Sequence, residues 1–222
     1  MTRRLAPCVL LATAAALLFA GGAQARSRTL QDGNPGSPIA EASPSLAPFQ
    51  HVRFCLRYPS DCKSDPTESD RIELNAENAN LLKRVNQTVN AAIAPMLKTY
   101  GPELKDGWTI APEMGDCNDY AVTKRHELQQ SGLPARALRL SVVKTASGIG
   151  HLVLVVSTTK GNLVLDNLSE AILPWQSTDY RWIKIQSAND ARFWFEVKAP
   201  AISASLSHNS RKLHLASQQP DI

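Results

Sequence analysis

The segment Gly115-Asp116-Cys117-Asn118-Asp119-Tyr120-Ala121 decides the fold, because it opens a helix that carries a cysteine in its first turn. From residue 117 to residue 130 the apolar positions recur at helical spacing, and Gly132-Leu133-Pro134 then supplies a stop. Beyond this stop the period changes to that of β-strands. The sequence therefore predicts a helix over residues 117–130 that is followed by a sheet.

Several β-rich runs follow the predicted helix. They cover residues 137–143, 151–157 and 163–166, with further candidates at 180–185 and 193–197. Ser147-Gly148 and Lys160-Gly161 separate the first three runs and are typical of hairpin turns. Strands joined by short turns pair antiparallel. We therefore predict an α+β fold in which the helix packs on an antiparallel sheet.

A second helix is predicted upstream of the cysteine. Asn75 can cap it. Its apolar positions follow steps of three and four residues: Leu82, Val85, Val89, Ile93 and Met96. One face of this helix should pack inward, and Pro95 should kink or end it.

Residues 1–25 are typical of a secretory signal peptide. Arg3 and Arg4 form a basic start, residues 9–20 are apolar, and Ala23-Gln24-Ala25 offers small residues for cleavage. The apolar run is short for a membrane span, and no later segment reaches the roughly 20 apolar residues that a span requires. We therefore expect a soluble periplasmic protein without a membrane anchor.

Composition divides the rest of the chain into three parts. Residues 26–50 are rich in Pro, Gly, Ser and Ala, which predicts a flexible lead-in. Residues 51–199 form the predicted folded domain, and the polar residues 200–222 a disordered tail.

The charge balance argues against a nucleic-acid partner. The formal net charge is +4, and it becomes +2 when Arg3 and Arg4 leave with the signal peptide. No run of like charges appears in the sequence. A balance this close to neutrality lacks the basic patch that nucleic-acid binding requires.

Three cysteines remain after removal of the signal peptide: Cys55, Cys62 and Cys117. An oxidising compartment permits disulfides, and Cys55 and Cys62 are close enough in sequence for a small covalent loop across a turn. Cys117 is then the odd thiol. Such a thiol is either a small buried hydrophobe or a reactive group.

The position of Cys117 at the first turn of a helix favours the reactive reading. Unsatisfied amide groups and the positive end of the helix dipole stabilise a thiolate there. Asp116 and Asp119 oppose this effect, so the thiolate needs an imidazolium partner. His151 is the best candidate, because it follows the flexible Ser147-Gly148-Ile149-Gly150 and opens a strand.

Asp166 can complete a triad with Cys117 and His151. It closes the next strand, and antiparallel pairing brings the start of one strand near the end of its neighbour. A carboxylate would accept one imidazole N–H and support the charged ring, whereas the neighbouring Asn167 would do this less well. The other histidines are weaker candidates: His51, His126, His208 and His214.

Four ordered segments together resemble the bacterial transglutaminase-like cysteine peptidases. They are Gly115-Asp116-Cys117-Asn118-Asp119-Tyr120-Ala121, Leu133-Pro134-Ala135-Arg136-Ala137-Leu138-Arg139, Gly150-His151-Leu152-Val153-Leu154-Val155-Val156 and Leu163-Val164-Leu165-Asp166-Asn167, and Phe54-Cys55 and Asp61-Cys62 precede them. The resemblance runs from Phe54 to about Trp194. It implies a papain-like fold with Cys117 as nucleophile, His151 as base and Asp166 as orienting acid.

The resemblance also implies a function and partners. The best understood branch of the family comprises periplasmic proteases that trim large surface adhesins and so release biofilm cells. A surface adhesin is therefore the implied substrate, and a regulatory inner-membrane protein is an implied partner.

In that branch, acidic residues around the nucleophile bind calcium. Asp116 and Asp119 match the pattern, but Asn118 stands where the family commonly has glutamate. The lost carboxylate lowers the charge that attracts a hard cation, so we expect no required cofactor and weak or absent calcium binding. Alternatively, these residues interact with the free amide groups of the helix start.

Other functions remain open at this level. A transglutaminase or an amidase could use the same triad, because access of the acceptor is a property of the cleft. A non-catalytic periplasmic binding module with this fold is a further alternative, although the complete triad argues against it. Trp108 either lines the cleft entrance or packs in the core.

Overall fold

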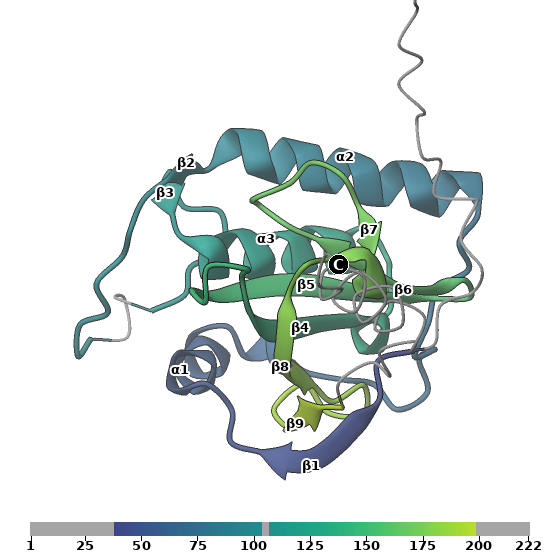
Figure 1. The fold of residues 1–222 in the computed structure, drawn as a ribbon, viewed down its shortest axis with the longest axis horizontal. Coiled ribbons are helices and arrows are strands. Elements are labelled where there is room, and N and C mark those ends of the chain that lie inside the picture. The colour runs from purple at the N-terminus through teal and green to yellow at the C-terminus, as the bar shows by residue number, and fades with distance from the viewer. Residues whose placement is uncertain (1–37, 104–106, 199–222) are drawn as a thin grey trace, which may run out of the picture.

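Helix α3 (Cys117–Gln130) lies between a seven-stranded sheet and helix α2 (Ala76–Ala92), as Figure 1 shows. The computed structural model describes residues 38–103 and 107–198. This arrangement confirms the predicted α+β fold, with the cysteine helix packed on an antiparallel sheet.

The strands of the sheet lie in the order β1-β9-β8-β4-β5-β6-β7, and every neighbouring pair is antiparallel. Their bounds are β1 Glu41–Ser45, β4 Leu138–Lys144, β5 Gly150–Thr158, β6 Gly161–Leu165, β7 Leu173–Pro174, β8 Arg181–Gln186 and β9 Trp194–Val197. The predicted meander corresponds to β4, β5 and β6. Gly148 has a φ of 83° and Gly161 a φ of 106°, which is why glycine suits the two hairpin turns.

Short elements join these larger ones. They are the parallel pair β2 (Ala94–Pro95) and β3 (Met114–Gly115), and the 3-10 helices η1 (Pro59–Cys62), η3 (Ala135–Ala137) and η4 (Trp175–Ser177). The β2–β3 pair brings the end of α2 next to the start of α3. This pair therefore fixes the position of Cys117 relative to α2.

Helix α2 begins as predicted, because the Asn75 side chain accepts a hydrogen bond from Asn78 N at 2.8 Å. It ends at Ala92, since the residue before Pro95 is disfavoured in helical conformation and the chain turns into β2. Met96 was expected on the buried face of this helix. That expectation is wrong, because Met96 lies beyond the helix end and is 39% exposed.

The core has two parts, one on each face of the sheet. Alternate residues of β5 divide between them: Leu152, Leu154 and Val156 face the helices, whereas Val153 and Val155 face the opposite side. Trp175 and Trp182 cover that opposite face and meet edge to face. Both faces of β5 are therefore buried, and the strand that begins with the His151 segment is rigidly held.

The predicted flexible lead-in over residues 26–50 is wrong for its described part. Strand β1 pairs with β9 at the sheet edge, Ile39 is buried, and α1 (Phe49–Arg57) begins inside this segment. Composition missed this order because an edge strand needs few large apolar residues when a neighbour supplies its hydrogen bonds. Residues 26–37, the predicted signal peptide 1–25 and the predicted tail 200–222 lie outside the described residues.

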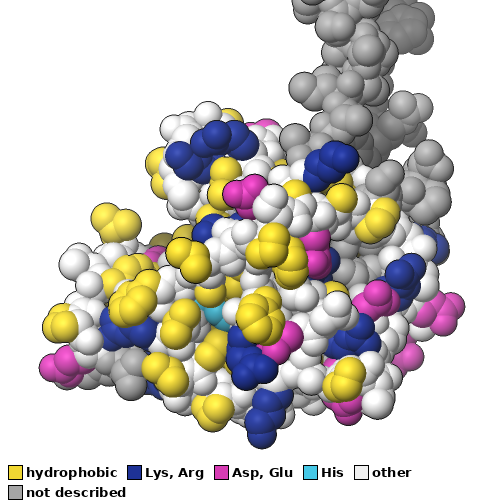
Figure 2. All heavy atoms as spheres, turned by 90° about the horizontal axis from the view of Figure 1, so that it is seen from below, with side chains coloured by type: hydrophobic (Ala, Val, Ile, Leu, Met, Phe, Trp, Pro, Cys, Tyr) yellow, Lys and Arg dark blue, Asp and Glu magenta, His cyan; other side chains and the backbone are white. Residues whose placement is uncertain are grey.

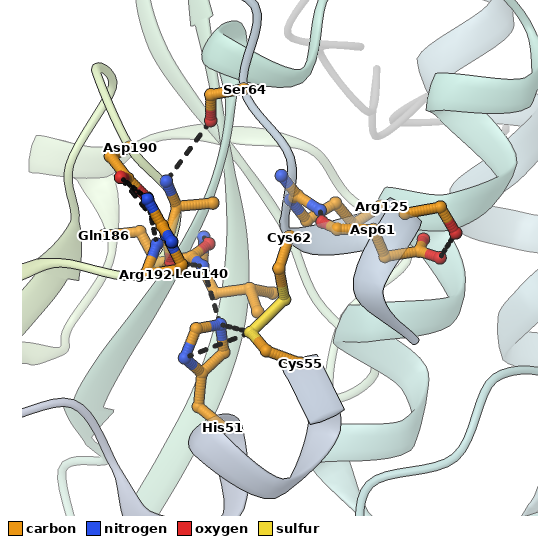
Figure 3. The surroundings of a disulfide bond; sticks show 12 residues. His51, Cys55, Asp61, Cys62, Ser64, Arg125, Leu140, Gln186, Asp190 and Arg192 are labelled. Carbon is orange, nitrogen blue, oxygen red and sulfur yellow. Dashed lines mark hydrogen bonds and ion pairs between the residues drawn. A yellow bond between two sulfur atoms is a disulfide. The ribbon is translucent and has the colours of Figure 1, made fainter. Parts of the chain in front are cut away.

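The expected disulfide joins Cys55 on α1 to Cys62 on η1 (Figure 3). The loop that it closes is also bound to α3. Arg125 donates to the carbonyl oxygens of Asp61 and Leu138, and His126 Nδ1 lies 2.8 Å from Asp61 Oδ1. The disulfide and these contacts together fasten α1 to the helix that carries Cys117.

Helix α1 keeps several apolar side chains in solvent. Figure 2 shows apolar groups gathered on the face below α1, β1 and β9 of Figure 1. The large exposed apolar residues of this region are Leu46, Phe49, Val52, Leu56 and Phe193. Across residues 38–103 and 107–198, none of the helices combines the length and apolar character that crossing a membrane requires.

Candidate active site

Cys117 is the first residue of α3 and is half-buried. Among the cysteines of the described residues it is the free one, because Cys55 and Cys62 form the disulfide. Backbone N–H groups of the first helical turn lack intrahelical partners, so they and the helix dipole favour an anion at this sulfur. The structure thus places Cys117 where the sequence predicted it.

The start of α3 is held by a reciprocal capping box. Asp116 Oδ1 accepts from Asn118 N at 3.0 Å, and Asp119 Oδ2 accepts from Asp116 N at 2.9 Å. Gly115 is required here, because a Cβ atom at this position would come within 2.7 Å of Asp119 Oδ2. The residues around Cys117 therefore fix its position at the start of α3.

His151 and Asp166 come together through the register of β5 and β6. Leu154 pairs with Leu165, so Asp166 follows β6 at the level of Val153. His151 lies two residues before Val153 on the same strand, beside the end of β6 from which Asp166 follows. Its Nε2 atom is 2.8 Å from Asp166 Oδ1, and it is Asp166 rather than Asn167 that makes this contact.

Asp166 engages Nε2 of His151 and not the opposite ring nitrogen, Nδ1, and Cys117 also acts on this ring. Burial lowers the pKa of His151, but the hydrogen bonds and negative charges of Asp166 and Cys117 outweigh it and raise the pKa to about 9. Burial raises the pKa of Asp166, whereas the contact with His151 lowers it more, and the net pKa is below its ordinary value. The pair is therefore held as imidazolium and carboxylate.

Two further groups hold the Asp166 carboxylate. The Tyr180 hydroxyl donates to Oδ2, and Leu168 N donates to Oδ1 at 3.1 Å. Burial and the Asp166 charge raise the pKa of Tyr180, which keeps it a donor. Sequence reasoning missed Tyr180 as a site residue, because it lies in another strand region and no local pattern links it to Asp166.

The acidic residues beside Cys117 are bound by groups of the chain itself. Asp119 is fully buried, and its Oδ1 accepts from Lys98 Nζ at 3.0 Å and from Thr109 N at 2.8 Å. Burial raises the pKa of Asp119, while the donors around it oppose this shift. The alternative expectation, in which these carboxylates serve the helix start, describes this geometry.

Asn118, the third residue of the predicted calcium site, directs its amide nitrogen toward Tyr100 and Asp116. Asn118 Nδ2 donates to Tyr100 Oη at 2.7 Å and to Asp116 Oδ1 at 3.1 Å, and the Tyr100 hydroxyl donates to Asp116. Calcium requires six to eight oxygen ligands. An arrangement that offers engaged carboxylates, an amide nitrogen and the Lys98 ammonium does not fit this ion.

The other aromatic and histidine candidates have partners other than Cys117, His151 and Asp166. Trp108 is 3% exposed and packs against His51 and Phe54, so it is a core residue and does not line the entrance. His51 is buried beside the disulfide, and His126 pairs with Asp61. His208 and His214 lie outside the described residues.

A family model described as bacterial transglutaminase-like cysteine proteinase matches residues 41–201. The chain belongs to this family. It is therefore a cysteine peptidase, and the transglutaminase-like resemblance and fold expected from its sequence motifs are confirmed. A comparison with curated protein sequences gave no match.

Solved structures of Legionella pneumophila LapG are similar to this cysteine proteinase. One is 20% identical, with a TM-score of 0.43, over 77% of this chain and 89% of that chain. The calcium-bound form is 19% identical, with a TM-score of 0.44, over 76% of this chain and 93% of that chain. At these values the likeness adds no argument, and the assignment rests on the family match.

Proposed function

We propose that this cysteine peptidase hydrolyses peptide bonds with Cys117 as nucleophile, His151 as proton carrier and Asp166 as orienting carboxylate. The observation that carries the proposal is the His151 Nε2 contact with Asp166 Oδ1, which leaves Nδ1 for the thiol at the start of α3. A thiolate beside an imidazolium is the activated form of a cysteine nucleophile.

In the first half-reaction, the Cys117 thiolate attacks the scissile carbonyl carbon and a C–S bond forms. The backbone N–H of Cys117, in the first turn of α3, is a donor for the oxyanion. His151 gives its proton to the amide nitrogen as the C–N bond breaks, and the amine leaves. An acyl-enzyme and a neutral imidazole result.

In the second half-reaction, water attacks the acyl carbon while His151 accepts its proton. The C–S bond breaks, the carboxylic acid leaves, and the thiolate–imidazolium pair is restored. Asp166 fixes the tautomer of the neutral His151 ring and stabilises the imidazolium whenever it forms.

Two measurements test this proposal on the purified protein. Cys117 should be alkylated rapidly near neutral pH, and Cys117→Ala should abolish peptide hydrolysis while remaining folded by circular dichroism. Near-normal hydrolysis by folded Cys117→Ala would dispose of the nucleophile assignment. Incorporation of an added amine without hydrolysis would identify a transglutaminase instead.

We further propose that the protein acts in the periplasm on a surface adhesin, and that a regulatory inner-membrane protein controls it. The support is the family membership and the signal-like residues 1–25. Incubation with secreted and outer-membrane proteins of the same cell, followed by sequencing of new termini, identifies the substrate. Cleavage confined to small soluble proteins would contradict the adhesin proposal.

Calcium is proposed to be unnecessary for this activity. The calcium-bound form is that of LapG, whereas the residues beside Cys117 here are bound to Lys98, Tyr100 and backbone amides. Calorimetric titration with calcium tests this directly. A tight, stoichiometric signal that Asp116→Ala abolishes would contradict it.

A further inference from the structure

Two groups of large apolar side chains remain exposed to solvent. The first is the face around α1 described above. The second group, among the residues that the structure describes, consists of Met96, Leu97, Met114, Ile149 and Leu168. A single exposed apolar residue is ordinary, whereas a group of them marks a contact surface. The members of this second group come from separate segments of the chain, and each segment adjoins a member of the triad.

The segments of Met114 and Met96 lie beside the start of α3. Met114 is on β3, three residues before Cys117, and β3 pairs with β2. Met96 N donates to Gly115 O at 2.8 Å, so the chain after β2 continues next to the residues that lead into Cys117. Met96, Leu97 and Met114 are therefore exposed on segments that adjoin the nucleophile.

Ile149 lies in the turn of the β4–β5 hairpin, two residues before His151. Thr145 N donates to Ile149 O at 3.0 Å, and Ile149 N donates to Thr145 Oγ1 at 3.2 Å. These bonds close the turn on itself and satisfy the backbone of Ile149. The side chain of Ile149 is nevertheless 67% exposed, so the turn presents it to solvent beside the triad histidine.

Leu168 is bound to the triad carboxylate through its backbone. Leu168 N donates to Asp166 Oδ1 at 3.1 Å, and this same oxygen lies 2.8 Å from His151 Nε2. Helix α2 holds the segment on either side of Leu168, because Asn90 Nδ2 donates to Asp166 O at 3.0 Å and Asn86 Nδ2 to the carbonyl oxygen of residue 169 at 3.3 Å. The backbone is thus fixed while the Leu168 side chain stays exposed.

A cavity of about 360 Å³ opens beside the same carboxylate. Its lining includes Asp166, Leu168 and Tyr180, together with the apolar Val164 and Leu173. Ligand pockets of proteins begin at about 300 Å³, so this cavity is large enough to hold an amino-acid side chain. Leu168 therefore combines an exposed apolar side chain with an adjoining hollow.

The chain keeps these side chains within reach of one bound peptide. Two residues of chain span at most about 7 Å and three residues about 11 Å. The Cα atoms of Ile149 and Leu168 thus lie within about 7 Å of those of His151 and Asp166. An extended peptide advances about 3.3 Å per residue, so its side chains two or three residues from the scissile bond lie about 7–10 Å away from that bond. The two ranges of distance coincide.

We propose that Met114, Ile149 and Leu168 are specificity-determining residues, which contact apolar side chains of an extended peptide within a few residues of the scissile bond. The driving force is the removal of apolar surface from water on both partners. The substrate class is therefore a peptide segment with apolar residues around the cleaved bond. The proposal rests on the proposed function, because it names the substrate of the same site.

Paired peptide substrates test this preference. Two peptides that differ only in leucine against the isosteric asparagine, next to the bond that is cleaved, should differ in kcat/KM by about 10- to 100-fold, with the leucine peptide the better. Ile149→Ser and Leu168→Ser should each lower this ratio severalfold. The matched control is Leu56→Ser, because Leu56 is 69% exposed but lies on α1, and the ratio should stay unchanged there.

A change of charge supplies a readout that structural damage would not produce. Ile149→Glu should raise kcat/KM for a lysine peptide relative to the leucine peptide by about tenfold, because it replaces an apolar contact by an attractive charge. A damaged site would instead lose activity toward both peptides. Equal cleavage of the leucine and asparagine peptides by the unaltered enzyme, or ratios that stay unchanged in these variants, would overturn the proposal.

Alkylation of Cys117 tests the apolar contacts without a peptide. N-hexylmaleimide should react with Cys117 faster, relative to N-ethylmaleimide, than it does with glutathione, and Ile149→Ser and Leu168→Ser should bring this ratio toward the glutathione value. A preference for the hexyl reagent without peptide hydrolysis would support the apolar contacts and remove the proposed function. Hydrolysis without any apolar preference would do the reverse.

Discussion

His151 and His51 are both buried, yet their surroundings move their pKa values in opposite directions. The pKa of His151 is raised to about 9, whereas that of His51 is lowered to about 3 by burial and by the charge of Arg125. His151 has a carboxylate at 2.8 Å. His51 instead accepts a hydrogen bond from Trp194 Nε1 at 3.2 Å and lies beside the disulfide.

The difference shows that burial alone keeps a histidine neutral and inert. One buried carboxylate reverses this effect, because it stabilises the charged ring more than burial penalises it. The molecule thus has one buried histidine that is held charged beside Asp166 and one, on α1, that is a neutral core residue.

The largest effect on activity is expected when His151, the charged histidine, is removed. His151→Ala should lower kcat/KM by about four orders of magnitude or more, because the proton carrier of both half-reactions is lost. Hydrolysis of a peptide substrate by the folded variant measures it. A loss below about tenfold would contradict the proposed role of His151.

The next largest effect on activity is expected when His151 loses its carboxylate partner and so becomes a buried histidine like His51. Asp166→Asn removes the carboxylate but retains a side chain of the same size, so the pKa of His151 should fall from about 9 towards or below its ordinary value. Activity should fall about 100-fold. Nuclear magnetic resonance titration of the imidazole checks the shift, and an unchanged pKa would contradict the assigned partner.

The unaltered enzyme should lose activity as the pH rises through about 9, where His151 gives up its proton. Well above this value each pH unit should cost about tenfold in rate.

The stability of the folded protein should depend on pH through the same histidine, His151. Because its folded pKa exceeds the unfolded value of 6.5, the stabilisation is complete below that value and disappears as the pH rises through about 9. Rate and melting temperature against pH test both statements, and a flat rate between pH 8 and about 10 would contradict them.

A smaller effect is expected at the neutral member of the comparison. His51→Leu leaves Trp194 Nε1 without its acceptor, which should cost about 1–3 kcal/mol of unfolding free energy. The activity of each folded molecule should be unchanged, because His51 lies outside the triad. Denaturant unfolding and active-site titration separate the two quantities, and a fall in kcat would show that His51 takes part in the chemistry.

The smallest effect is expected from calcium removal. A chelator should change neither activity nor melting temperature, because Lys98 and backbone amides already engage the Asp119 carboxylate. Calcium added back in excess provides the control. A drop in melting temperature with chelator, restored by calcium, would contradict this expectation.

Local patterns predicted much of the fold and of the site. Helical spacing gave α2 and α3, turn glycines gave the β4–β5–β6 meander, and sequence separation gave the disulfide. The lead-in was misjudged, because the order of β1 comes from its partner β9 and not from its own composition. Asp116 and Asp119 were predicted to lie beside Cys117. No local pattern in the sequence indicated that Tyr100 and Lys98 donate hydrogen bonds to them.

The sequence by itself determined that Cys117 opens a helix, and that His151 and Asp166 lie on neighbouring strands joined by a turn. Periodicity, capping residues and turn residues encode such features within a few positions of the chain. Tertiary structure alone decided that Nε2 of His151 meets Asp166 and that Tyr180 and Asn90 hold this residue. These contacts join segments far apart in the sequence, and their geometry depends on how α2, α3 and the sheet pack together.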